Sequence, residues 1–183
     1  MELIERRIES EIKYSGKVLS LREDTVELPN KAVAKREVVE HNGAVGVVPI
    51  TDENEIILVK QFRAGVQKIT LELPAGKLEL GEDPLDCGIR ELEEETGYKA
   101  KSFKHLTSFA TSPAILEEVI HVYLATDLYE GEINPDEDEF VEIIKMPVDE
   151  IKKLIISGEI DDGKTIIGVL LATEYLKSLG VEN

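Results

Sequence analysis

The sequence has few of the residues that mark secreted or membrane-spanning proteins. Its 183 residues include one cysteine, Cys87, so no internal disulfide can form, which fits a reducing compartment. No apolar run reaches the roughly 18 residues that a membrane span needs. The charged N-terminus, MELIERRIES, also has no apolar core of a secretory signal. We therefore expect a cytoplasmic protein with no membrane partner.

Basic residues and histidines are also scarce. The chain has 21 Lys and Arg against 38 Asp and Glu, for a net charge of −17, which argues against binding the phosphate backbone of nucleic acids. The three histidines, at 41, 105 and 121, are scattered and form no zinc or nucleophile pattern. A protein this acidic that handles an anionic ligand must neutralise it locally, and divalent cations held by carboxylates would do so.

The hydrophobic pattern predicts two regions. Residues 1–42 alternate apolar and polar side chains and read as a small antiparallel β-rich N-terminal region. Residues 43–183 read as a second domain of the α/β (α+β) class, with a mixed sheet sandwiched between helices. Strands are expected at 44–50, 55–63, within 100–127 and at 140–147, a loop with an extended piece at 64–82, and helices at 84–96, 148–158 and 162–179.

The helix at 84–96 carries an unusual cluster of carboxylates. Asp83 suits its N-cap, Pro84 its first turn and Gly97 its C-terminal stop. Glu91, Glu94 and Glu95 share one face at helical spacing, while Leu85, Ile89 and Leu92 lie on another face, which we expect to be buried together with Cys87. Stacked like charges cost a few tenths of a kcal/mol per pair, so they indicate either a solvated acidic face or a site for a hard cation.

The residues around this helix complete a specific motif, G-x5-E-x7-R-E-U-x-E-E-x-G-U, in which U is a bulky apolar residue. Every defined position is filled, by Gly76, Glu82, Arg90, Glu91, Leu92, Glu94, Glu95, Gly97 and Tyr98. The stretch therefore resembles the Nudix box, and the resemblance implies a Nudix α/β/α sandwich that hydrolyses a nucleoside diphosphate linked to another group.

The resemblance also implies roles for individual residues. Metal ligands would be Glu91, Glu95 and Glu94, the last also supporting catalysis, with the backbone carbonyl of Ala75 as a further ligand. The metal would be Mg²⁺, with Mn²⁺ as a possible substitute. Glu82 and Arg90 would brace the loop by ion pairing, and Gly76 and Gly97 would allow backbone conformations that a side chain hinders.

Segments outside the box resemble the ADP-ribose pyrophosphatase subfamily. Pro113 lies at the position of its marker proline, and residues 112–118 resemble its S-P-G-x-x-x-E loop, with Ala114 in place of the usual glycine. Residues 40–45, 61–63 and 72–76 also resemble this subfamily. In these enzymes the N-terminal strands exchange between two subunits and help to build the substrate site, so the resemblance implies a homodimer.

The remaining site residues follow from position and chemistry. Arg63 ends a strand just before a loop, and its planar guanidinium suits a phosphate or ribose; Arg36 and Glu118 are further candidate substrate contacts. The acidic segment 136–139 lies where the subfamily carries its general base, and Glu139 and Glu137 are equal candidates.

The resemblance to this subfamily therefore implies Mg²⁺-dependent hydrolysis of ADP-ribose to AMP and ribose 5-phosphate. Alternatives within the same chemistry are another sugar nucleotide, a dinucleotide, FAD, NADH or an oxidised nucleoside triphosphate. Alternatives of another class are a non-catalytic ADP-ribose sensor and an interaction protein that uses an acidic face. The intact box argues against both.

Overall fold

The computed structural model describes residues 3–132, 134 and 140–180. The chain divides into two compact units. The first contains the residues up to 43 together with 110–119, and the second contains 44–109 and the residues from 120 onwards. No helix in the described ranges is both long and apolar enough to cross a membrane.

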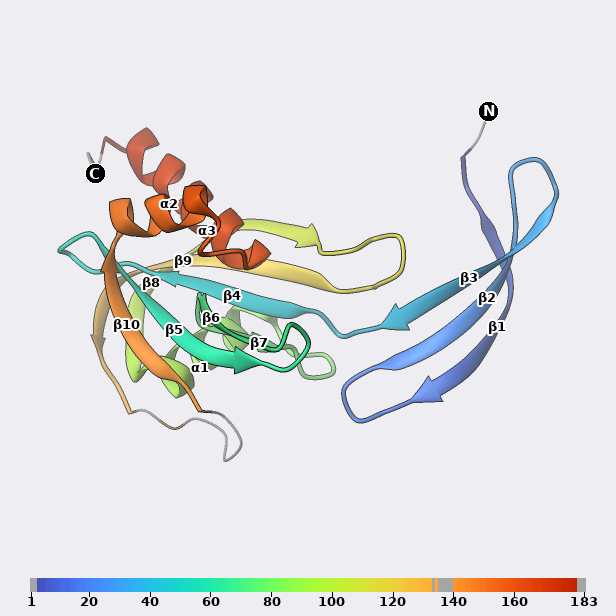
Figure 1. Cartoon of the computed structure of the whole chain (residues 1–183), viewed down its shortest axis with the longest axis horizontal. Coiled ribbons are helices and arrows are strands. Elements are labelled where there is room, and N and C mark those ends of the chain that lie inside the picture. The colour runs from blue at the N-terminus through green and yellow to red at the C-terminus, as the bar shows by residue number, and fades with distance from the viewer. Residues whose placement is uncertain (1–2, 133, 135–139, 181–183) are drawn as a thin grey trace. The chain divides into compact units, whose positions relative to one another are not determined.

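The first unit is built on a three-stranded antiparallel sheet in the order β1-β2-β3 (Figure 1). Its strands are β1 (Arg6–Ser15), β2 (Ser20–Glu27) and β3 (Val33–Glu40). Along β2, Arg22, Asp24 and Val26 are buried while their neighbours are half-buried, the two-residue alternation expected of a strand with one covered face. The antiparallel N-terminal sheet expected from the sequence is thus confirmed.

The second unit holds two sheets. One has the order β7-β4-β9-β8 and the other β10-β5-β6. In the first sheet β4 pairs with β9 in parallel and with β7 in antiparallel fashion, so the sheet is mixed, as predicted. The strands of this unit are β4 (Ala44–Pro49), β5 (Glu55–Arg63), β6 (Lys68–Glu72), β7 (Ala75–Lys77), β8 (Tyr98–Ala110), β9 (Val119–Glu130) and β10 (Glu142–Pro147).

Helices pack on both faces of β4. A Cβ atom on Gly88 of α1 (Pro84–Thr96) would lie 3.2 Å from Val45 and 3.4 Å from Val47, so this helix approaches one face closely. On the other face, a Cβ atom on Gly168 of α3 (Gly163–Ser178) would lie 3.1 Å from Val48. The remaining helix, α2 (Val148–Ser157), packs against α3 and β10. This layering confirms the predicted α/β/α sandwich.

The buried face of α1 differs from the one predicted. Leu92 and Cys87 are buried, but Ile89 is 41% exposed and Leu85 is half-buried. Gly88 lets the helix approach β4, so the buried stripe passes through Gly88 and Leu92 and carries Glu91 and Glu95 inward. Apolar spacing alone favoured Ile89 because it takes no account of glycine as a contact residue.

Cys87 is expected to be chemically inert in the folded chain. Its thiol is fully buried, and this burial, with the charges of Glu82 and Glu91, raises its pKa from 9.0 to about 12. Alkylation by iodoacetamide needs the thiolate, so we expect native-state labelling at least about 100-fold slower than labelling in guanidinium, as read by mass spectrometry. Equal rates in the two conditions would contradict the buried position.

Candidate active site

The segment that leads from β6 into β7 is held by hydrogen bonds on both sides. The backbone N–H of Leu73 donates to Thr165 Oγ1 of α3 at 2.9 Å, and the N–H of Val47 donates to the Pro74 carbonyl at 2.9 Å. The N–H of Ala75 donates to Glu95 Oε2 at 2.9 Å. Ala75 and Glu95, both predicted metal ligands, are therefore brought together although 20 residues separate them.

Gly76 provides the space that Glu91 occupies. A Cβ atom at position 76 would overlap the Glu91 carboxylate, well inside the 3.0 Å limit that real Cβ atoms keep. Gly76 is not among the residues with positive φ, so the constraint here is steric and not conformational. The Glu91 carboxylate thus lies directly on the backbone of the loop, one residue from the contact between Ala75 and Glu95.

Arg90 connects the carboxylates of the loop and the helix. Its Nη2 lies 3.1 Å from Glu82 Oε1, and its Nη1 lies 2.7 Å from Glu91 Oε1 and 2.9 Å from Glu94 Oε2. Burial alone would lower the pKa of Arg90, but these carboxylates outweigh it and raise the pKa. The structure places Arg90 and Glu82 in the ion pair that the sequence analysis predicted.

Helix α1 begins and ends at the capping residues that the sequence predicted. Asp83 accepts a hydrogen bond from the N–H of Leu85 at 2.8 Å, and Pro84 occupies the first turn. Gly97 ends the helix in a left-handed conformation with φ of 69°, and its N–H donates to the Glu93 carbonyl. This fixed register holds Glu91 and Glu95 against the loop, while Glu94 pairs with Arg90 one turn earlier on the same helix.

The donors of this site suit a hard divalent cation. Carboxylate oxygens from Glu91, Glu94 and Glu95 are the ligand type that Mg²⁺ and Mn²⁺ prefer, and the Gly76 cradle and the Ala75 N–H hold two of them. Within the described ranges, however, no three His, Cys, Asp or Glu side chains are already arranged as a metal site. In this conformation the Arg90 guanidinium is the cation between Glu91 and Glu94.

Arg63 does not stand alone at the end of β5. Its Nε and Nη2 donate to the two carboxylate oxygens of Glu72 at 2.9 and 2.7 Å. Lys164 of α3 and the Thr70 hydroxyl also donate to Glu72. Burial alone would raise the pKa of Glu72, but Arg63, Lys164 and Thr70 outweigh it and lower the pKa from 4.5 to about 2.

This network predicts a pH-dependent contribution to stability. Because the folded pKa of Glu72 lies below its unfolded value, the stabilisation is complete above pH 4.5 and is lost as the pH falls toward 2. Glu72→Gln should lower the free energy of unfolding by roughly 3 kcal/mol at neutral pH, and roughly half of that difference should vanish by a pH of about 3. Urea unfolding followed by circular dichroism measures it; a difference independent of pH would contradict the assigned pairing.

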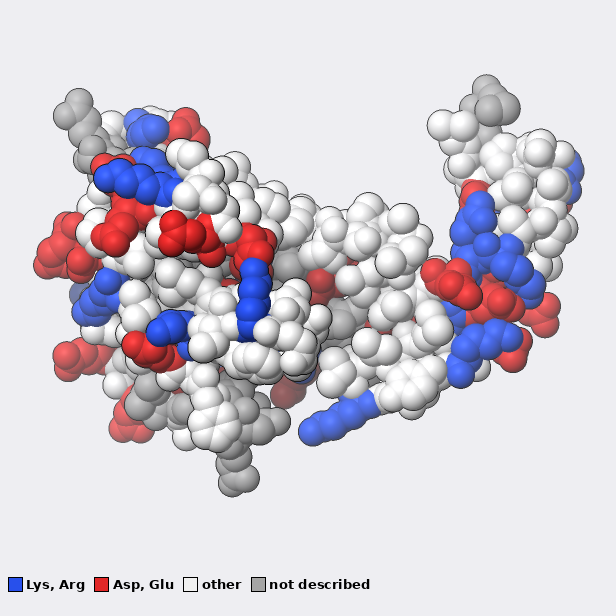
Figure 2. Space-filling model, viewed as in Figure 1, with Lys and Arg blue, Asp and Glu red and all other residues white. Residues whose placement is uncertain are grey.

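The two other predicted substrate contacts belong to the first unit. The Arg36 guanidinium pairs with Glu5, with Nη2 to Oε1 at 2.6 Å, and Glu118 accepts from the Thr111 hydroxyl at 2.8 Å. Figure 2 shows Lys and Arg side chains of this unit beside Asp and Glu side chains on the face in view. The predicted bases Glu137 and Glu139 lie outside the described residues.

The sequence analysis gave no individual role to three charged residues that form ion-pair networks in the structure: Glu72, Lys164 and Arg22. Glu72 and Lys164 are 92 residues apart, and only the folded chain brings them together. Arg22 lies on the covered face of β2 and contacts Asp24, Glu40 and Glu117 at 3.0, 3.0 and 2.7 Å. One sequence signal could have identified Arg22 and Glu72 as members of buried ion-pair networks. Each is a charged residue at a position where the alternation of its strand points the side chain inward.

Gln61 adds an unused donor on the same strand as Arg63. Its Nε2 is buried and makes no hydrogen bond within the described part of the chain. Alternation along β5 puts the side chains of Gln61 and Arg63 on one face of the strand. A buried amide donor costs free energy unless a partner satisfies it, so this face has capacity for one further acceptor.

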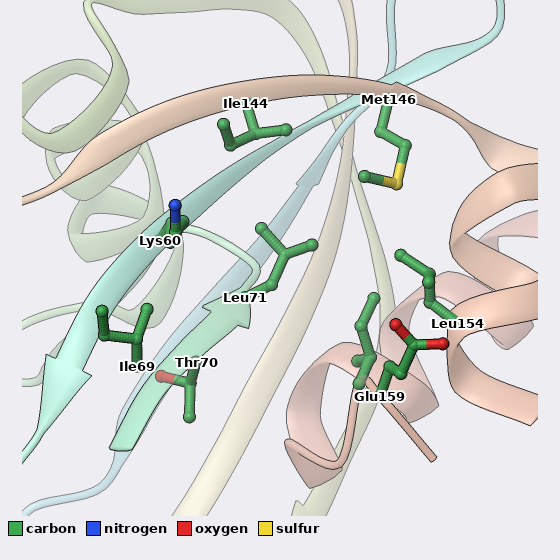
Figure 3. A pocket seen from close by; sticks show the side chains of 9 residues that line it. Lys60, Ile69, Thr70, Leu71, Ile144, Met146, Leu154 and Glu159 are labelled. Atoms are coloured by element: carbon green, nitrogen blue, oxygen red, sulfur yellow. The ribbon is translucent and has the colours of Figure 1, made fainter. Parts of the chain in front are cut away.

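A cavity of about 330 Å³ lies beside β5 and β6 (Figure 3). It is lined mainly by apolar side chains, with Lys60 and Glu159 as the charged ones. Lys60 and Leu71, which pair across the two strands, point opposite to their neighbours Gln61 and Glu72. Thr70, whose hydroxyl donates to Glu72, also lines the cavity, so the cavity borders the network around Arg63.

Two family profiles match consecutive parts of the chain. The profile of the NUDIX domain matches residues 40–166, and the profile of the nucleoside diphosphate sugar hydrolase N-terminal domain matches residues 5–39. Together they cover nearly all of the described chain.

Individual relatives align over most of their length. The methanol dehydrogenase activator of Bacillus methanolicus is 48% identical over 90% of each chain, and the ADP-ribose pyrophosphatase of Bacillus subtilis is 47% identical over 91% of each chain. The ADP-ribose pyrophosphatase of Mycobacterium tuberculosis is 37% identical over 89% of this chain and 80% of its own. A crystal structure of an ADP compounds hydrolase superposes with a TM-score of 0.86 over 97% of each chain, at 22% identity, and shows a shared fold.

Proposed function

The chain belongs to the Nudix family, and on that premise we propose that it hydrolyses the diphosphate of ADP-ribose to AMP and ribose 5-phosphate. The observation that carries the substrate is the 47% identity, over 91% of both chains, to a protein named ADP-ribose pyrophosphatase. The site supports the same chemistry, because the carboxylates of Glu95 and Glu91 lie against the loop at Ala75 and Gly76.

Nudix hydrolases generally use divalent metal ions, and we propose Mg²⁺ here, with Mn²⁺ as a substitute. Glu91, Glu94, Glu95 and the carbonyl of Ala75 are the proposed ligands. When bound, the metal supplies positive charge to the diphosphate and lowers the pKa of a coordinated water. Arg90 releases Glu91 and Glu94 in this proposal and stays paired with Glu82.

The protein's own residues place the substrate and accept a proton. Arg63 presents its guanidinium at the end of β5 and is the proposed contact for the diphosphate. Arg36 and Glu118 are the further proposed substrate contacts. Glu139 or Glu137 is the proposed base that takes the proton of the attacking water. Because no covalent intermediate forms, catalysis consists of placement and charge stabilisation.

We also propose that the chain is a cytoplasmic homodimer. In the first unit, Ile8 and Ile12 of β1 are each 53% exposed and Tyr14 is 59% exposed, and a second copy would cover these apolar side chains. Light scattering is expected to give twice the mass of one chain, and Ile12→Lys is expected to shift the population toward monomer. A monomer for the unmodified chain would contradict the proposal.

A product assay with a panel of substrates tests the proposed function. The panel contains ADP-ribose, GDP-mannose, FAD, NADH and a dinucleoside polyphosphate, each with Mg²⁺. The highest kcat/KM is expected for ADP-ribose, with AMP and ribose 5-phosphate as products. A clear preference for another compound would keep the Nudix chemistry and reject the substrate.

A second function has a specific observation in its favour. The relative from Bacillus methanolicus is named methanol dehydrogenase activator and is 48% identical over 90% of each chain. Activation of a methanol dehydrogenase is therefore the alternative. A dehydrogenase assay with and without this chain distinguishes the two, since an ADP-ribose hydrolase with no second role leaves that rate unchanged.

A further inference from the structure

The Glu72 carboxylate is a buried charge whose hydrogen-bond donors come from several elements of the second unit. Its side chain is 3% exposed and accepts two hydrogen bonds from Arg63, one from Thr70 and one from Lys164. These donors come from β5, β6 and α3. A buried charge persists only where its oxygens are satisfied, and this one is held from three elements at once.

The contact with Arg63 fixes the plane of the guanidinium as well as its position. Glu72 takes hydrogen bonds from Nε and Nη2, which is one edge of the fork. A guanidinium has five N–H donors, so three remain for another partner. The Arg63 side chain is 43% exposed although Glu72 is buried, so the free edge is accessible to an anion.

The Arg63 guanidinium interacts electrostatically with Glu95 of α1. The hydrogen bonds to Glu72 contribute most to the raised pKa of Arg63, and the charge of Glu95 contributes as well. Glu95 is anchored on the N–H of Ala75, three residues after Glu72. The guanidinium and the candidate metal ligands are therefore positioned by one continuous segment, residues 72–76.

Helix α3 contacts the segment 72–76 through Lys164 and Thr165. Lys164 pairs with both Glu72 and Asp162, and Thr165 accepts from the Leu73 N–H while its hydroxyl donates to Asp162 at 2.6 Å. Asp162 is also the N-cap of α3 and accepts from the N–H of Thr165. The start of α3 thus determines where Glu72 lies.

We propose that Glu72 is a positioning residue that orients Arg63 toward the diphosphate of the substrate, with Lys164 and Thr70 holding Glu72 in place. Glu72 itself does not touch the substrate, because its oxygens are used by protein donors. The inference rests on the proposed function through the assignment of Arg63. It adds that substrate affinity depends on Glu72, a buried carboxylate that does not itself contact the substrate.

A double-mutant cycle on Arg63 and Glu72 tests this role. Glu72→Gln is expected to raise KM for ADP-ribose about 10-fold with a smaller change in kcat, because Arg63 loses its fixed orientation. Arg63→Ala is expected to raise KM further. The double variant should be no worse than Arg63→Ala alone, since Glu72 acts only through Arg63. Additive losses, or an unchanged KM for Glu72→Gln, would overturn the proposal.

A control variant tests whether loss of any carboxylate that pairs with a cation of β5 changes KM. Glu142→Gln removes the ion pair between Glu142 of β10 and Lys60 of β5, at a site where Glu142 is 63% exposed, and should leave KM unchanged. The Nε–H resonance of Arg63 in ¹⁵N NMR gives a readout without turnover. The exchange of this proton with solvent should be slow in the unmodified chain and faster in Glu72→Gln. Equal exchange in the two proteins would reject the proposal that Glu72 orients Arg63.

The outcome remains interpretable if ADP-ribose is not the substrate. In that case the unmodified chain fails to hydrolyse ADP-ribose, and the same cycle is run on the compound of the panel that it does hydrolyse. Coupling between Arg63 and Glu72 would then support the positioning role of Glu72, while ADP-ribose is rejected as the substrate. Absence of coupling, measured with a compound that the chain hydrolyses well, would reject the positioning role alone.

Discussion

Replacement of Gly76 with alanine is expected to reduce kcat about 100-fold while the chain stays folded. The added methyl group would overlap the Glu91 carboxylate, and the flexible end of that side chain is the part able to move. Displacing Glu91 removes a proposed metal ligand from its position on the loop. The overpacking itself should cost about 1–3 kcal/mol, which lowers the melting temperature by several degrees.

Gly65→Ala is the matched control for this prediction. A Cβ atom at Gly65 would meet nothing within 4 Å, and Gly65 has no positive φ, so the same chemical change should leave both kcat and the melting temperature nearly unchanged. Full activity of Gly76→Ala on ADP-ribose would show that the position of Glu91 against the loop is irrelevant to turnover.

Glu95→Gln is expected to lower kcat by at least about 100-fold at saturating Mg²⁺. The glutamine retains an oxygen that can accept the Ala75 N–H, so the loop and the fold should survive. What disappears is the negative charge, on which the attraction for a divalent cation depends. Steady-state assays with ADP-ribose, combined with thermal unfolding, measure the two effects separately.

Glu93→Gln controls for loss of charge on the same helix. Glu93 pairs with Lys99 at 2.8 Å, away from the loop, so its replacement should leave turnover unchanged. Wild-type turnover by Glu95→Gln at saturating Mg²⁺ would sink the assignment of Glu95 as a metal ligand. Loss of activity in both variants would point to overall charge in place of a specific site.

Local patterns predicted most of the elements because their causes are local. Asp83, Pro84 and Gly97 set the ends of α1 through their own backbone and hydrogen-bonding properties, and the structure begins and ends that helix where they predict. The alternating strands of the first unit and the apolar run of β4 are likewise read directly from the sequence. The box residues Glu82 and Arg90 form the ion pair that the resemblance to the Nudix box implied.

The rest depends on contacts between residues far apart in the chain. The sequence analysis placed Ile89 inside, but Gly88 packs on β4 and leaves Ile89 41% exposed. It treated 64–82 as a loop with an extended piece, whereas β6 and β7 form there by pairing with β5 and β4. It also did not find the pairing of Arg63 with Glu72, because the network that joins Arg63, Glu72 and Lys164 forms only in the folded chain.

The most direct test of the central claim is ³¹P NMR of ADP-ribose incubated with the chain and Mg²⁺. The account predicts that the diphosphate resonances disappear and two phosphomonoester resonances, those of AMP and ribose 5-phosphate, replace them. It also predicts that chelation of the metal by EDTA stops the reaction. Persistence of the diphosphate resonances in the presence of Mg²⁺ would contradict the account.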